Sequence, residues 1–239
     1  MQDIIKKIEI MECDYHRTLP PKQVVSHAMS AVLEYMRATG GDRDRLYDTC
    51  GAVWMITHMK FRQHAIIYPE YELRFHVHPR VIDGGHYTFR AEVFRGEEPI
   101  VDFSTAFVPV HKTERHVLRL SLSEPIWTEN AVTDASVSLH RLRPSCEFRP
   151  CGSDCVRMSD CDINHHLTSS AYLALICDAL DYWNGSDSRY MREMQVDFTS
   201  EVMPGTLLQY ERGEQDGAKF ARGVKPDGKI AFTARCVYD

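Results

Sequence analysis

The two halves of the chain repeat one pattern of residues, and this repeat is the feature that most restricts the possible folds. Residues 11–19 align with 159–167, and an aspartate and a leucine fall on equivalent positions in each copy. Further along, residues 59–73 align with 194–208, and a proline is shared at equivalent positions. A repeat of this length predicts two copies of one supersecondary unit that pack against each other.

Each copy is predicted to contain one long helix followed by antiparallel strands. In 21–36, apolar residues recur at three- and four-residue spacing, which indicates an amphipathic helix. In 169–183, the apolar residues cover nearly all sides, which indicates a buried helix. Residues 121–144 have little periodicity and are interpreted as the connection between the halves. The simplest packing of such an α+β chain wraps each sheet around its helix.

Alternating apolar and polar residues predict the strands. Two turns, 83–85 and 226–228, carry the glycines and aspartates typical of hairpins. Strands are expected at 73–78, 87–93, 100–110, 189–198, 207–211, 219–224 and 230–238.

Composition narrows the class of protein. The chain has 239 residues, of which 44% are hydrophobic and 26% charged, as in ordinary globular proteins. No apolar run approaches the roughly 18 residues of a membrane span, and the first residues do not resemble a signal peptide, so a cytoplasmic protein is expected. The net charge of −6 argues against nucleic acid as a partner. An acidic partner would need a local basic patch.

The cysteines do not predict a metal centre. Of eight cysteines, four are close in sequence: Cys146, Cys151, Cys155 and Cys161. They lack the Cys-x-x-Cys spacing of common zinc sites. We interpret them as reduced thiols, which leaves open whether they have a further role.

The most informative segment for function is 156–172. Asp160, Asp162, Asn164 and His166 occupy every second position directly before the second helix. At the period of a strand, these four side chains would face the same way. Histidine can accept a proton near neutral pH, and asparagine can orient a water molecule or donate to an oxygen. Taken alone, the two aspartates favour turn or cap roles over a functional one.

This segment resembles the signature Asp-x-Asn-x-His-Val-Asn-Asn of the acyl-acyl-carrier-protein (acyl-ACP) thioesterases. Here the signature reads Asp162-Ile-Asn164-His165-His166-Leu167-Thr168-Ser169. The resemblance implies a tandem, or double, hotdog fold with two sheets side by side. It assigns 1–125 to an N-terminal half on the acyl-chain side and 140–239 to a catalytic C-terminal half.

The resemblance also implies a second carboxylate. Glu201 takes the position of the family's glutamate, 35 residues after His166 (201 − 166 = 35). In the first half of the repeat, the counterparts of Asn164, His166 and Glu201 are residues without this chemistry, namely His16, Thr18 and Ile66. This asymmetry predicts that catalysis belongs to the second half.

Three positions depart from the family pattern. Val202 stands where the family often has cysteine, which excludes a cysteine nucleophile there. Thr168-Ser169 replaces the paired asparagines, and either residue can cap the helix that follows. His165 adds a neighbouring imidazole, so a register shift of one residue would exchange it with His166.

The sequence therefore predicts hydrolysis of fatty acyl-ACP thioesters in fatty acid biosynthesis, with activated water as the nucleophile and without a metal or organic cofactor. The expected catalytic residues are Asp162, Asn164, His166 and Glu201. An apolar tunnel for the acyl chain is expected beside Met29, Leu33 and Trp54.

The expected partner is a carrier protein with a phosphopantetheine-linked acyl chain, and a homodimer is left open. Four arginines form a basic stretch that can contact the phosphopantetheine phosphate or the carrier, or can be an ordinary solvated face: Arg141, Arg143, Arg149 and Arg157. The alternatives are an acyl-CoA thioesterase and a non-catalytic module that binds acyl thioesters. The sequence does not specify the acyl chain length.

Overall fold

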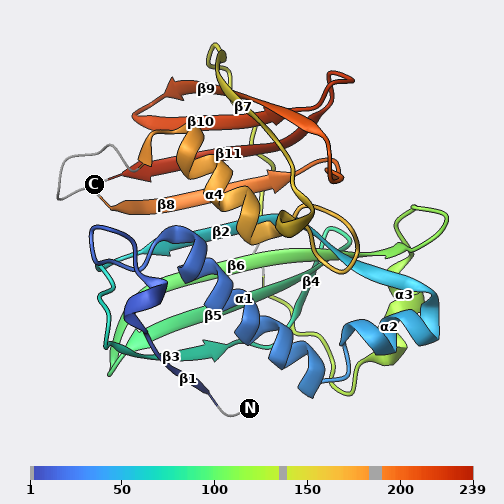
Figure 1. Cartoon of the computed structure of the whole chain (residues 1–239). Helices are drawn as coiled ribbons and strands as arrows, with labels where there is room; N and C mark the ends of the chain where they lie inside the picture. Colours follow the sequence, from blue (N-terminus) through green and yellow to red (C-terminus); the bar gives the residue numbers. More distant parts are fainter. Residues whose placement is uncertain (1–2, 135–138, 183–189, 239) are drawn as a thin grey trace.

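The computed structural model describes residues 3–134, 139–182 and 190–238. Its strands form one eleven-stranded antiparallel sheet in the order β1-β3-β5-β6-β2-β8-β11-β10-β9-β7, and β4 pairs with β5 (Figure 1). The strands are β1 (Ile4–Lys7), β2 (Ala52–Gln63), β3 (Glu72–Val77), β4 (Val81–Asp83), β5 (His86–Arg95), β6 (Glu98–His111), β7 (Arg149–Cys155), β8 (Met191–Phe198), β9 (Leu207–Gln215), β10 (Ala218–Val224) and β11 (Ile230–Tyr238).

The strand order shows the internal repeat directly. Reading outward from the centre, β2-β6-β5-β3-β1 of the first half corresponds to β8-β11-β10-β9-β7 of the second. The two halves join where β2 pairs antiparallel with β8, and Lys60 lies opposite Gln195 in the middle of that pairing. Equivalent strands from the two halves thus meet edge to edge, which removes the open sheet edge that each half would otherwise expose at this strand.

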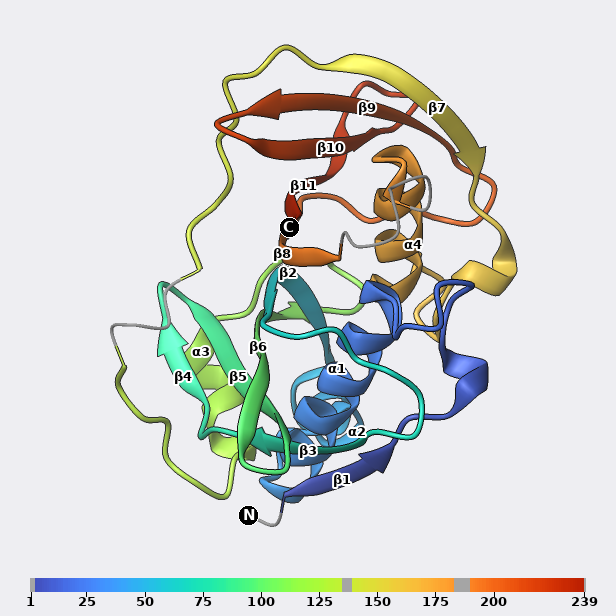
Figure 2. The same cartoon turned by 90° about the vertical axis from the view of Figure 1, so that its left-hand side faces the viewer.

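One long helix from each half lies on the same side of the sheet. Figure 2 shows α1 (Pro21–Ala38) and α4 (Ser169–Ala179) enclosed by the curved sheet. Proline suits the first position of α1 because it has no N–H to satisfy. Each helix contributes fully buried residues to one shared core, for example Ala28 and Val32 from α1, and Leu173 and Ile176 from α4. Two helices wrapped by antiparallel strands match the architecture predicted from the repeat.

Several elements differ from the sequence expectations. The second helix ends at Ala179, with Leu180 as its C-cap, and the rest of the expected span up to 183 reaches residues outside the described ranges. The structure also contains a helix that was not expected, α2 (Arg43–Cys50). It buries only Leu46, so its sequence has no apolar stripe that would predict a helix. Instead, the Asp42 side chain caps its first turn by accepting the N–H of Arg45.

The connection between the halves is more structured than predicted. It begins with a short helix, α3 (Leu120–Ser123), and a 3₁₀ turn, η2 (Glu124–Ile126). Farther along, the His140 carbonyl accepts a hydrogen bond from Gln195, and the Leu142 N–H donates to Asp197. Because both of these strand residues lie on the face of β8 opposite α4, the connection crosses the outer side of the sheet. No helix in the described ranges is long and apolar enough to span a bilayer.

The loops before α1 and α4 repeat in atomic detail. Asp14 accepts the N–H groups of the residues two and four positions later, and Asp162 does the same in the second loop. Arg17 and His165, at equivalent positions, both adopt left-handed backbone conformations, with φ of 61° and 62°. The repeat visible in the sequence therefore encodes one loop structure that is used twice.

Candidate active site

A cavity of about 1010 Å³ lies where the two halves meet. Its lining includes residues of α1 and β2 from the first half, and of α4 and the segments around it from the second. All four expected catalytic residues reach its wall: Asp162, Asn164, His166 and Glu201. So do the three apolar residues expected beside the acyl chain: Met29, Leu33 and Trp54.

The polar motif forms a tight turn and not a strand, so the prediction that its four side chains form one row was wrong. The segment begins with the 3₁₀ turn η4 (Met158–Asp160), in which the Asp160 carboxylate accepts the N–H of Arg157. Asp162 Oδ1 then accepts the N–H groups of Asn164 at 2.8 Å and His166 at 3.4 Å. These local bonds favour a turn over an extended chain. Both aspartates thus shape the loop, and Asp160 does not line the cavity.

His166 meets Glu201 at the wall of the cavity. Their Nε2 and Oε2 atoms are 3.3 Å apart, and the side chains are 13% and 32% exposed. Glu201 lies just after β8, and the two segments are joined by a hydrogen bond from the Leu167 N–H to the Val202 carbonyl, at 2.9 Å. His165, the alternative register, is exposed and is not part of the cavity wall.

The surroundings of His166 disfavour protonation of its imidazole and so lower its pKa. Burial lowers the pKa of His166, and the nearby Arg115 cation lowers it further. The Asp162 carboxylate partly opposes this effect and His165 adds to it. A neutral imidazole can accept a proton, so the site can perform base chemistry near neutral pH.

The N-terminus of α4 borders the same cavity. Thr168 is its N-cap: the side-chain oxygen accepts the N–H of Ala171 at 3.1 Å. Thr168 and Ser169 both line the cavity. Because the first N–H groups of a helix have no partner within it, this end of α4 favours a negatively charged oxygen.

The apolar part of the wall is held by an aromatic cluster. The Trp54 indole N–H donates to the Gly41 carbonyl at 2.8 Å, which fixes the ring. The rings of Tyr87, Phe107 and Trp127 lie with their centroids 5.1–6.4 Å from that of Trp54. This part of the wall is therefore apolar and well packed, which suits an acyl chain.

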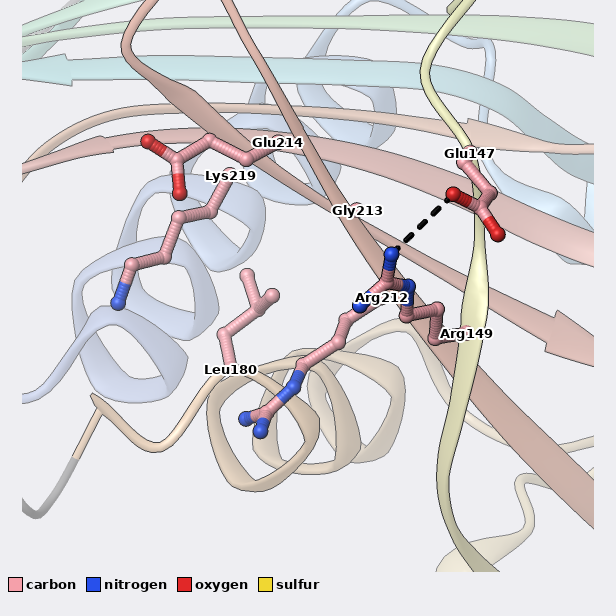
Figure 3. Close-up of a pocket in the computed structure, with 7 residues that line it drawn as sticks. All are labelled: Glu147, Arg149, Leu180, Arg212, Gly213, Glu214 and Lys219. Atoms are coloured by element: carbon pink, nitrogen blue, oxygen red, sulfur yellow. Dashed lines mark hydrogen bonds and ion pairs between the residues drawn. The ribbon is translucent and has the colours of Figure 1, made fainter.

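The four expected arginines do not gather at this cavity. Arg149, on β7, lines a separate pocket of about 570 Å³ together with Arg212 and Lys219 (Figure 3). That pocket includes Leu180, at the C-terminal end of α4, so it is separated from the catalytic set by the length of the helix, roughly 16 Å.

The other three arginines occupy two different places. Arg141 and Arg143 flank Leu142, which bonds to Asp197 on the outer side of the sheet. Arg157 directly precedes η4 and is the one of the four next to the loop that carries His166. These arginines are near one another in sequence but do not lie together in the fold, because β7 separates Arg149 from Arg157.

Sequence reasoning missed two cationic residues that contact Glu201. Arg115, in the turn after β6, forms an ion pair with Glu201. Lys225 donates to the Glu201 carbonyl at 3.4 Å. Both line the cavity. No sequence motif identifies either residue, because both lie far from the polar motif along the chain. Arg115 also belongs to the first half.

All eight cysteines are free thiols. Within the described ranges, no group of three or more His, Cys, Asp or Glu side chains is arranged to hold a metal ion.

Comparison with known proteins relates this geometry to one family. The profile of the acyl-ACP thioesterase C-terminal domain matches residues 153–238, which include the polar loop, α4 and the strands β8–β11. No curated protein sequence matches the chain.

Solved structures match over the full length. An acyl-ACP thioesterase from Bacteroides thetaiotaomicron superposes with a TM-score of 0.82 at 12% identity, and the match covers 100% of this chain and 97% of that one. A 12:0-ACP thioesterase from Umbellularia californica gives 0.80 at 13% identity, with 100% and 96% covered. A MaoC-like dehydratase from Phytophthora capsici gives 0.52 at 13% identity, with 78% and 72% covered. These matches confirm the double hotdog fold, while the reaction has to be argued from the site itself.

Proposed function

We propose that this chain, whose residues 153–238 match the acyl-ACP thioesterase C-terminal domain, hydrolyses fatty acyl-ACP thioesters to free fatty acid and carrier protein. One observation carries this proposal. His166, paired with Glu201, lines a cavity whose wall also includes apolar residues of the other half of the molecule, among them Met29, Leu33 and Trp54. The C-terminal half supplies the catalytic residues, and the N-terminal half holds the acyl chain.

The chemistry needs one activated water molecule. The His166–Glu201 pair accepts a proton from water as the water oxygen attacks the thioester carbonyl carbon, which forms the C–O bond. The tetrahedral intermediate then collapses, the C–S bond breaks, and the pair returns the proton to the leaving sulfur. The products are a carboxylic acid and the carrier's thiol, and no covalent acyl-enzyme is required.

The transition state places negative charge on the former carbonyl oxygen. Asn164 and the first N–H groups of α4 lie on the cavity wall and are the donors available for that oxygen. Asp162 acts indirectly: it bonds the backbone of Asn164 and His166 and so fixes both side chains relative to α4.

The acyl chain occupies the apolar part of the cavity. Met29 and Leu33 come from α1, and Trp54 comes from β2. The hydrogen bond from the Trp54 indole to Gly41 holds this ring in the wall. The acyl length that fits best is a question for substrate panels.

We propose that the carrier protein contacts arginines of the C-terminal half. Carrier proteins are acidic, whereas this chain has a net charge of −6, so recruitment depends on local cations. Among the four expected arginines, Arg157 has the most direct position because it precedes the catalytic loop.

An acyl-CoA thioesterase is the second candidate, since CoA and carrier protein present the same pantetheine arm. Release of free fatty acid should be measured from matched panels of acyl-ACP and acyl-CoA of increasing chain length. We expect the higher kcat/KM with acyl-ACP. A preference for acyl-CoA would identify the second candidate, and tight binding of acyl thioester without release would identify a non-catalytic module.

A further inference from the structure

Arg115 reaches across the junction between the halves to the catalytic carboxylate. Its guanidinium pairs with Oε1 of Glu201, while Oε2 of the same carboxylate faces Nε2 of His166 at 3.3 Å. The two oxygens of Glu201 therefore have different partners. One is committed to a cation from the N-terminal half, and the other is left for the catalytic imidazole.

The turn that carries Arg115 is built to hold it in place. The Arg115 N–H donates to the His111 carbonyl at 2.9 Å, and the His111 N–H donates to the His116 carbonyl at 2.9 Å. The His111 and His116 rings are stacked, with an interplanar angle of 3°. Arg115 itself has φ of 56°, a left-handed conformation that a non-glycine residue seldom adopts. The surrounding bonds thus impose a backbone conformation that the residue alone would not choose.

We propose that Arg115 is a positioning residue for the hydrolysis reaction: by binding one oxygen of Glu201, it fixes the other oxygen against His166. This inference rests on the proposed function. It also gives the N-terminal half a part in catalysis beyond holding the acyl chain, because the second half alone would leave the Glu201 carboxylate free to rotate away.

Electrostatics support the same assignment. The charged and titratable groups around His166 are Arg115 and Glu201 from neighbouring segments and Asp162 and His165 from its own loop, and Lys225 lies at the Glu201 main chain. Of these, Arg115 is the largest single charge effect that lowers the pKa of His166. Removing it leaves the Glu201 anion unpaired beside the imidazole, and both changes raise the pKa of His166.

The test compares Arg115→Gln, Arg115→Lys and Glu201→Gln with Arg119→Gln, in which an exposed arginine four residues away is replaced. Steady-state rates on an acyl thioester are measured as a function of pH. The His166 ring is titrated by NMR in each variant, and thermal unfolding verifies that each variant is folded.

For Arg115→Gln, we expect kcat to fall by about 10- to 100-fold with little change in KM, as for a misplaced catalytic group. The acidic limb of the pH profile should move to higher pH, and the NMR titration of His166 should move with it. Arg115→Lys keeps the positive charge but not the planar guanidinium. The acidic limb of its pH profile should therefore stay near that of the wild type, and its kcat should lie between those of Arg115→Gln and the wild type. In a Glu201→Gln background, adding Arg115→Gln should change the rate little, because its target is already altered.

Two results would overturn the proposal. One is an Arg115→Gln enzyme with the kcat and pH profile of Arg119→Gln. The other is a raised KM at unchanged kcat, which would make Arg115 a substrate contact. The NMR titration keeps the test independent of the proposed function. If the wild type releases no fatty acid, that function fails, while a His166 titration unmoved by Arg115→Gln would separately refute the positioning role.

Discussion

At the scale of single residues, the candidate site depends on two side chains that the chain brings together across a hydrogen-bonded junction. His166 lies in the loop before α4, and Glu201 lies just after β8. The bond between the Leu167 N–H and the Val202 carbonyl aligns these segments one residue beyond each side chain. The polar motif identified His166 and the family resemblance identified Glu201, but only the fold shows that their side chains meet.

The first prediction concerns this pair. His166→Ala and Glu201→Ala should each lower kcat by a factor on the order of 10² or more, as expected when a general base is lost. If the two residues handle one proton together, the double variant should be little worse than either single variant. Stopped assays of fatty acid release measure all three. Multiplicative losses would show that the residues act separately.

The second prediction concerns pH. Because burial and Arg115 lower the pKa of His166 below the ordinary value of 6.5, its base form persists to lower pH than that of an exposed histidine. The acidic limb of kcat/KM should therefore have its half-maximal point below pH 6.5. A half-maximal point above this value, in a profile that His166→Ala abolishes, would contradict the electrostatics described here.

At the scale of elements, the loop before each long helix is the unit that the chain repeats. Both loops use an aspartate to bond two backbone N–H groups, and both place a left-handed residue three positions before the helix N-cap. Only the second loop carries an asparagine and a histidine at the positions that follow. The chain thus offers a built-in control, because one loop structure exists with and without the catalytic side chains.

The third prediction uses that control. Asp162→Ala and Asp14→Ala should each lower the free energy of unfolding by about 1–2 kcal/mol, as expected for lost hydrogen bonds to a carboxylate. Asp162→Ala should also reduce kcat by at least about tenfold, because it releases the loop that positions His166. Asp14→Ala should keep full activity. Denaturant unfolding and steady-state kinetics measure both effects, and equal losses of activity in the two variants would refute a local role for Asp162.

Elements with regular periodicity could be predicted from the sequence, and those held by local bonds could not. The apolar stripe located α1 to within two residues of its end. The polar α2 and the turn at 158–166 had no such pattern, because an aspartate cap and backbone hydrogen bonds define them. For the same reason, the polar motif resembled a strand: alternation in a row of polar residues does not distinguish an extended chain from a turn.

At the scale of the whole molecule, both halves contribute residues to one candidate site. The pairing of β2 with β8 makes one sheet, and both halves contribute residues to the wall of one cavity. The sequence repeat predicted two similar halves, each with antiparallel strands around one long helix. The contribution of Arg115 could not be predicted, because it depends on how the turn after β6 lies against the second half.

The fourth prediction concerns recognition of the carrier. Arg149 is the first residue of β7, whereas Arg157 lies two residues beyond its end and adjoins the catalytic loop. Arg157→Glu should raise KM for acyl-ACP more than Arg149→Glu, and neither should affect a small acyl thioester. Because exposed charges are screened over about 8 Å at physiological ionic strength, the effect should shrink as salt is added. Equal effects of both variants on the small substrate would assign these arginines to folding.

The central claim is that His166 and Glu201 direct a water molecule to a thioester carbonyl. The most direct measurement is a single turnover of acyl-ACP in ¹⁸O-labelled water with enzyme in excess, followed by mass spectrometry of the product. We expect free fatty acid that carries one ¹⁸O atom, formed by the wild-type enzyme and on the order of 10²-fold more slowly by His166→Ala. Unlabelled fatty acid, no release by the wild type, or equal rates in the two enzymes would contradict the claim.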